Sequence, residues 1–119
     1  MEDMKLGMIE SRFANMIWQK EPISSGDLVK LCAEELSWKK STTYTILRKL
    51  CDKGIFQNQN GTVTSLISKQ DFYARQSEQI VNDTFDGSLP AFVAAFTTLN
   101  RLSDSDIAEL QRLIEQSRR

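Results

Sequence analysis

The sequence predicts a mainly α-helical protein with one small β-hairpin, arranged as a winged helix-turn-helix followed by a helical region. Three observations predict this fold. Apolar residues recur at helical spacing over most of the 119 residues, the spacing becomes alternating on both sides of Asn60-Gly61, and helical spacing then returns. Three helices followed by a hairpin is the order of a winged helix-turn-helix, with the hairpin as the wing.

The first two helices are predicted from apolar spacing and from the residues at their ends. Apolar side chains recur every three or four residues over 6–20, which indicates a helix with one buried face. Ser24 or Ser25 is expected to cap the next helix, because Ser24 with Asp27 resembles a capping box.

The third helix and the hairpin follow. The helix is expected to run to Lys53, since the glycine that comes next is a natural stop. Alternating segments over 55–59 and 62–67 flank Asn60-Gly61, a dipeptide that favours a two-residue hairpin turn.

Three more helices are predicted after the hairpin, the first over about 70–86 and the others capped by Ser88 and Ser103. Their apolar stripes are narrow, and we expect them to pack against a second copy; covering the winged helix of a monomer is the alternative. We therefore predict a winged-helix domain over 1–69 and a dimerisation region over 70–119. The predicted dimer residues are Phe72, Ile80, Phe85, Leu89, Phe92, Phe96, Leu110, Leu113 and Ile114.

Composition excludes several classes of protein. The chain is 40% hydrophobic and 26% charged, as soluble globular proteins are. No apolar run approaches the ~20 residues of a membrane span, so we expect a cytoplasmic protein that does not bind membranes. The absence of histidine removes most acid–base and zinc chemistry, and we expect no enzyme, metal or cofactor. Cys32 and Cys51 form no CxxC pair and are expected to be reduced, buried thiols.

The third helix carries the candidate binding face. Five bases and one acid fall within 38–53 of a chain whose formal net charge is −1, and this local positive charge suits a polyanion. At about 100° per residue, Thr43, Ile46, Leu47 and Leu50 face the core. Hydroxyls, a phenol and cations lie opposite and suit the major groove, where an arginine pairs with guanine. The predicted DNA contacts, including two on the wing, are Lys39, Lys40, Ser41, Thr42, Tyr44, Thr45, Arg48, Lys49, Asn58 and Asn60.

Two functions from different classes fit this pattern. One is sequence-specific binding of double-stranded DNA, and the other is a winged-helix module that docks proteins without binding DNA. The polar face alone fits both. Its combination with the cationic cluster and the Asn-Gly wing favours DNA.

The run from Trp38 to Phe56 resembles the recognition-helix signature of the penicillinase repressor family (the BlaI/MecI/CopY type). Glu10, Trp18 and the segment from Ile23 to Val29 match the first two helices of that family, and 102–115 resembles its last helix. The matching positions in the signature are Trp38, Thr42, Thr45, Leu50, Lys53 and Gly54, with Lys49 where the family usually has arginine.

The resemblance implies a homodimeric repressor that binds an inverted-repeat DNA operator. In the antibiotic-resistance branch it also implies a sensor protease as partner, with cleavage at an Asn-Phe bond; this chain has Ala95-Phe96 at that place. In the copper branch Cys-x-Cys pairs bind metal, and this sequence contains no such pair.

Overall fold

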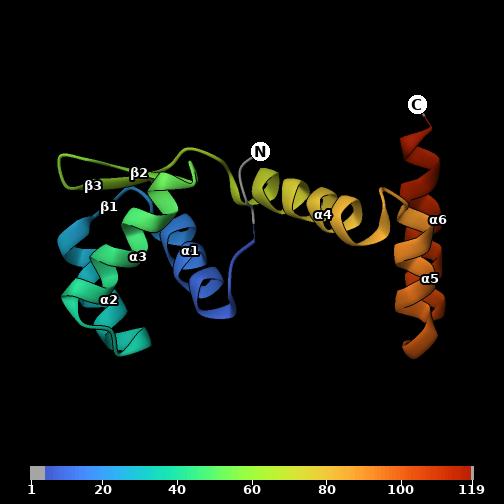
Figure 1. Ribbon diagram of the computed structural model, residues 1–119, viewed down its shortest axis with the longest axis horizontal. Coiled ribbons are helices and arrows are strands. Elements are labelled where there is room, and N and C mark those ends of the chain that lie inside the picture. The colour runs from blue at the N-terminus through green and yellow to red at the C-terminus, as the bar shows by residue number, and fades with distance from the viewer. Residues whose placement is uncertain (1–4, 119) are drawn as a thin grey trace. The chain divides into compact units, whose positions relative to one another are not determined.

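The computed structural model describes residues 5–118. Within them the order of elements is one helix, one short strand, two helices, two strands and three helices (Figure 1). The expected mainly α-helical fold with a small β-hairpin is confirmed. The chain forms two compact units that divide after Gln79, within α4 (Lys69–Phe85). The predicted domain boundary between residues 69 and 70 stays a prediction.

The core of the first unit receives one face of each of its three leading helices, α1 (Met8–Lys20), α2 (Ser25–Leu36) and α3 (Lys40–Asp52). The buried positions on each helix follow the helical spacing of the apolar residues, because only one face of a helix can turn inward. The buried core side chains are Phe13, Ala14, Ile17, Leu28, Cys32, Leu47, Leu50, Ile55, Phe56, Val63 and Phe72, with Thr43 beside them.

The helix ends follow local hydrogen bonding. Ser24 caps α2, since its Oγ accepts a hydrogen bond from the Asp27 backbone N–H over 3.0 Å. The α1 helix begins at Met8, two residues later than predicted. The Glu10 carboxylate accepts a hydrogen bond from the Gly7 N–H over 3.1 Å and thereby closes the first turn at that point.

The wing consists of β2 (Phe56–Gln59) and β3 (Thr62–Ser65), which pair antiparallel. Asn60 and Gly61 both have positive φ, 53° and 86°, as a type I′ turn requires. The sequence did not predict β1 (Ile23–Ser24), which pairs antiparallel with β3 and makes a three-stranded sheet in the order β1-β3-β2.

Trp18 joins α1 to the segment after the wing. Its Nε1 donates a hydrogen bond to the Ile67 carbonyl over 3.0 Å. Its ring packs against Phe56 and Phe72, with ring centroids 5.2 and 5.5 Å away. Phe72, near the start of α4, is only 1% exposed. We therefore assign Phe72 to the core of the first unit and not to the dimer surface for which the sequence proposed it.

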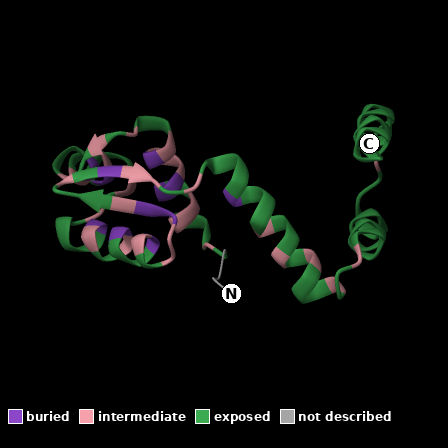
Figure 2. Cartoon of the chain, turned by 90° about the horizontal axis from the view of Figure 1, so that it is seen from above, coloured by how far each residue is buried: buried purple, intermediate pink, exposed green. Residues whose placement is uncertain are grey.

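The second unit contains the end of α4, α5 (Leu89–Leu99) and α6 (Asp104–Ser117). Ser88 and Ser103 cap the last two helices as predicted, each through its side-chain oxygen. Neither α5 nor α6 has a single buried residue, and Figure 2 shows both helices almost entirely in the colour of exposed residues. Between residues 5 and 118 no helix is long and apolar enough to cross a membrane.

Candidate nucleic-acid interface

The outward face of α3 is polar and exposed, as its spacing predicted. Thr43, Leu47 and Leu50 are buried on the inner side, and Ile46 is half-buried. The opposite side of the helix carries the hydroxyl and cationic side chains, and these residues are exposed. Its exposed members are Lys40, Ser41, Thr42, Thr45, Arg48 and Lys49, with Lys39 just before the helix.

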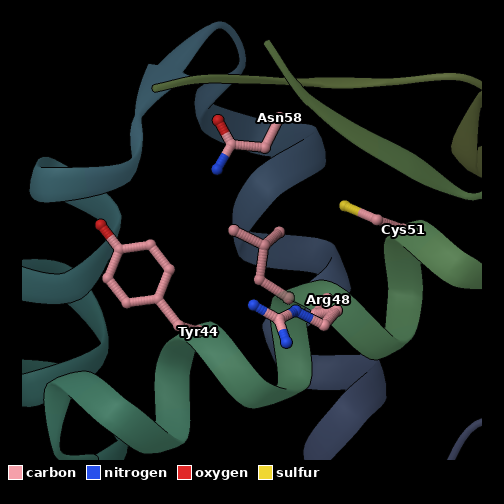
Figure 3. A pocket seen from close by; sticks show the side chains of 5 residues that line it. Tyr44, Arg48, Cys51 and Asn58 are labelled. Carbon is pink, nitrogen blue, oxygen red and sulfur yellow. The ribbon is translucent and has the colours of Figure 1, made fainter. Parts of the chain in front are cut away.

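A pocket of about 230 Å³ lies between α3 and β2. It is lined by Tyr44, Leu47, Arg48, Cys51 and Asn58 (Figure 3). The pocket brings Arg48 of the helix together with Asn58 of the wing, two residues that the sequence singled out separately. The guanidinium of Arg48 and the amide of Asn58 thus lie at the same pocket, and both groups can form hydrogen bonds with the base edges or the phosphates of DNA.

Three of the predicted contacts on α3 already have partners within the chain. The Tyr44 hydroxyl donates a hydrogen bond to Ser25 Oγ over 3.0 Å. The Thr45 hydroxyl donates to the Ser41 carbonyl over 2.9 Å, although the residue as a whole is exposed. The Lys49 ammonium lies 2.8 Å from Glu10 Oε2 of α1. Lys49 is therefore paired with an acid of its own unit, whereas Arg48 forms no ion pair with another residue between 5 and 118.

Glu10 pairs with Lys49, one of the candidate DNA contacts, and spacing alone did not identify it. Its carboxylate bonds to Lys49 and to the Gly7 N–H, and these two bonds hold its pKa below the ordinary value of 4.5, against the opposing effect of burial. The carboxylate thus stays charged at neutral pH and ties α1 to α3. In the sequence it was marked by its place on the helix predicted over 6–20 and by its match to the first helix of the family that the chain resembles.

The wing offers amides and hydroxyls but no charge. No charged residue occurs between Lys53 and Lys69. Asn58 Oδ1 accepts a hydrogen bond from the Gly61 N–H over 3.1 Å and so stabilises the turn, while Asn60 lies exposed at its tip. Any contact of this hairpin with DNA therefore uses hydrogen bonds and not ion pairs.

Both cysteine thiols are free, and among the described residues no group of three or more possible metal ligands gathers. Cys32 is buried, whereas Cys51 is only half-buried, at the pocket. Burial raises the pKa of both thiols, with an added effect of Asp52 on Cys51, so both are protonated at neutral pH.

The second unit exposes a row of large apolar side chains on α5 and α6. Phe92 packs against Phe85 at a ring-centroid distance of 5.5 Å, yet Phe92 is still 36% exposed and Phe96 is 50% exposed. Large apolar surfaces of this kind are rare on monomers. The exposed residues that the sequence assigned to a dimer are Ile80, Leu89, Phe92, Phe96, Leu110, Leu113 and Ile114.

Comparisons with known proteins extend over nearly the whole chain. Residues 6–116 match a family model described as penicillinase repressor. The chain is 26% identical over 111 residues to the penicillinase repressor of Bacillus licheniformis, covering 90% of this chain and 87% of that protein. It is 22% identical over 116 residues to the methicillin resistance regulatory protein MecI of Staphylococcus aureus (strain Mu50 / ATCC 700699), covering 94% of each.

Among solved structures, the multiple antibiotic-resistance repressor (MarR) of Listeria monocytogenes 4b F2365 has a TM-score of 0.49 to this chain at 18% sequence identity. The match covers 97% of this chain and 74% of that one.

Proposed function

Because the chain belongs to the penicillinase repressor family, whose model covers residues 6–116, we propose that it is a homodimeric transcriptional repressor of the cytoplasm that binds an inverted-repeat DNA operator. The family and its relatives are regulators and not enzymes, which confirms the expectation that this chain is not an enzyme. The proposal goes further, because it names the DNA-contacting residues and the assembly.

The observation on which the DNA-binding surface rests is the exposed face of α3 beside the wing, with Arg48 and Asn58 at one pocket. In this proposal α3 enters the major groove, and the Arg48 guanidinium pairs with a guanine through two parallel hydrogen bonds. Lys39 and Lys40, at the start of α3, bind phosphates and set the register. The uncharged wing contributes hydrogen bonds to the adjoining backbone or groove.

Alanine variants test these roles, with a duplex that the wild-type chain enriches from a random library and an unselected duplex of the same length. Arg48→Ala and Thr45→Ala are each expected to cost about 1–3 kcal/mol on the enriched duplex and little on the unselected one. Lys39→Ala and Lys40→Ala are expected to weaken both. Equal effects of all four variants on both duplexes would refute the base contacts. A wild-type chain that enriches no sequence would instead favour a protein-docking module.

The proposed dimer rests on the exposed apolar side chains of α5 and α6. In a two-fold pair, the same surface of each copy covers the other. Two α3 helices then reach two half-sites whose centres lie one helical turn, about 34–36 Å, or a multiple of it apart. Binding of the second half-site becomes intramolecular, so a chain with few free cations still binds DNA tightly. Sedimentation equilibrium of the wild-type chain without DNA tests this, and a monomer at tens of micromolar would refute it.

A further inference from the structure

Ser25, the first residue of α2, forms hydrogen bonds with both the wing and α3. Its backbone N–H donates to the Gly61 carbonyl in the wing turn over 2.8 Å. Its Oγ accepts a hydrogen bond from the Tyr44 hydroxyl over 3.0 Å. The residue before it, Ser24, pairs with Thr62 in the sheet. One half-buried serine therefore connects the two elements that are proposed to contact DNA.

The bond to Ser25 fixes the position of the Tyr44 ring. The hydroxyl oxygen lies on the axis about which the ring turns, so the hydrogen bond restricts the first side-chain torsion, which places the ring, while packing against the core limits rotation of the ring about its own axis. The ring forms one side of the pocket that Arg48 and Asn58 also line (Figure 3). The position of Arg48 in the pocket is thus bounded by a ring that Ser25 holds in place.

Building on the proposed function, we propose that Ser25 is a positioning residue for sequence-specific recognition of DNA. It holds the Tyr44 ring in one place relative to the wing turn. The ring lines the pocket beside Arg48, and its fixed position limits the directions in which the Arg48 side chain can point toward a base. The two hydrogen bonds between Arg48 and a guanine depend on the direction of the guanidinium, and a small displacement of that group weakens them. The attraction between a lysine ammonium and a phosphate acts over a longer range and is less directional, so phosphate contacts tolerate a small displacement.

Discrimination between DNA sequences separates this role from a structural one. Discrimination is the affinity for a duplex that the wild-type chain enriches from a random library, divided by the affinity for an unselected duplex of equal length. Ser25→Ala and Tyr44→Phe each remove one partner of the same hydrogen bond, and each is expected to lower discrimination about five- to tenfold. The double variant is expected to lose no more than either single variant, because the bond is already broken.

Two further variants complete the experiment. Ser25→Thr keeps the hydroxyl and is expected to retain discrimination. Ser77→Ala makes the same chemical change as Ser25→Ala but on α4, where it removes a hydrogen bond of 2.8 Å to the Ala74 carbonyl and leaves Ser25, Tyr44 and the wing intact, and it is expected to keep wild-type discrimination. For Ser25→Ala we expect wild-type affinity and salt dependence on the unselected duplex and a melting temperature close to that of the Ser77→Ala control.

Four results would overturn the positioning role. Unchanged discrimination in Ser25→Ala would show that the bond does not matter for recognition. An equal loss on both duplexes would show that Ser25 contacts a phosphate directly. Additive losses in the double variant would show that Ser25 and Tyr44 act separately. A wild-type chain that enriches no sequence would refute the proposed function itself, whereas the first three results leave that function standing.

Discussion

Replacing Glu10 by glutamine is expected to release Lys49 from α1 and to change both stability and DNA binding. In the wild-type chain the Lys49 ammonium lies 2.8 Å from Glu10 Oε2, and the other carboxylate oxygen accepts a hydrogen bond from the Gly7 N–H. Glutamine has nearly the same shape and can still accept from Gly7. The substitution therefore removes the charge at the end of α1 and little else.

The expected loss of stability is small, because water reaches the pair. The Lys49 side chain is 54% exposed and that of Glu10 is 17% exposed. Partly exposed ion pairs contribute about 0.2–1 kcal/mol, so Glu10→Gln is expected to lower the free energy of unfolding by about 0.5 kcal/mol at pH 7. A decrease of several kcal/mol in the free energy of unfolding would be expected only if the ion pair were buried.

The pH dependence of this loss has a definite sign. The bonds to Lys49 and Gly7 lower the pKa of Glu10 from 4.5, so the folded state binds the proton more weakly than the unfolded state. The carboxylate contribution is then fully present above pH 4.5 and is lost as the pH falls through the lower pKa of the folded chain. The stability difference between wild type and Glu10→Gln is expected to be constant from pH 5 to 7 and to shrink below pH 4.5.

The released lysine also becomes available to DNA. One added phosphate contact makes the slope of log affinity against log salt steeper by about one for each protomer. Urea denaturation at fixed protein concentration and fluorescence anisotropy on an unselected duplex at several salt concentrations measure the two effects. Glu34→Gln, an exposed acid on α2, is the matched control and is expected to change neither. A Glu10→Gln variant with the wild-type salt slope would show that Lys49 does not face DNA even when free.

Two other substitutions test the core and the proposed dimer. Trp18→Phe removes the hydrogen-bond donor to the Ile67 carbonyl and is expected to lower the free energy of unfolding by about 1–3 kcal/mol in urea denaturation. A loss of only a few tenths of a kcal/mol would mean that a water molecule takes over as donor to that carbonyl. Phe92→Asp is expected to give monomers in sedimentation equilibrium, because burying a carboxylate among the apolar side chains of this surface is costly. A dimer of wild-type strength would place the interface elsewhere.

The residues that the sequence predicted best are those whose structure depends on near neighbours. Ser88 and Ser103 start helices because each oxygen needs only a backbone N–H three residues away. Asn60-Gly61 forms the turn because both residues tolerate positive φ. The buried side of α3 follows from spacing alone, since the helix presents one face to the core whatever lies beneath it.

What the sequence did not predict depends on distant partners. β1 is two residues long, and Ile23–Ser24 becomes a strand only by pairing with Val63 and Thr62 about forty residues later. Phe72 shares an apolar stripe with Ile80, and the stripe shows which face is apolar but not that Phe72 packs against Trp18. Lys49 carries the same charge as Arg48 in the sequence, and only the fold places Glu10 beside it.

These partners limit how many cations of α3 remain for phosphates, and the limit gives a last prediction. Lys49 is paired with Glu10, and the Lys53 ammonium donates a hydrogen bond to the Lys5 carbonyl. Of the five bases within 38–53, this leaves Lys39, Lys40 and Arg48 for DNA, and because Arg48 is assigned to a guanine, only Lys39 and Lys40 are left for phosphates. Each phosphate contact contributes about −0.9 to the slope of log affinity against log salt, which gives about −2 for one protomer and about −4 for two.

Anisotropy titrations of the wild-type chain against a half-site duplex and a full operator, from low to moderate salt, measure both slopes. A slope much steeper than about −4 on the full operator would mean that other cations, such as those of α1 and α2, also bind phosphates. It would contradict the proposed interface, in which α3 supplies the charge and the uncharged wing supplies only hydrogen bonds. A slope of about −2 on both duplexes would mean that one α3 at a time contacts DNA, and would contradict the two-fold arrangement.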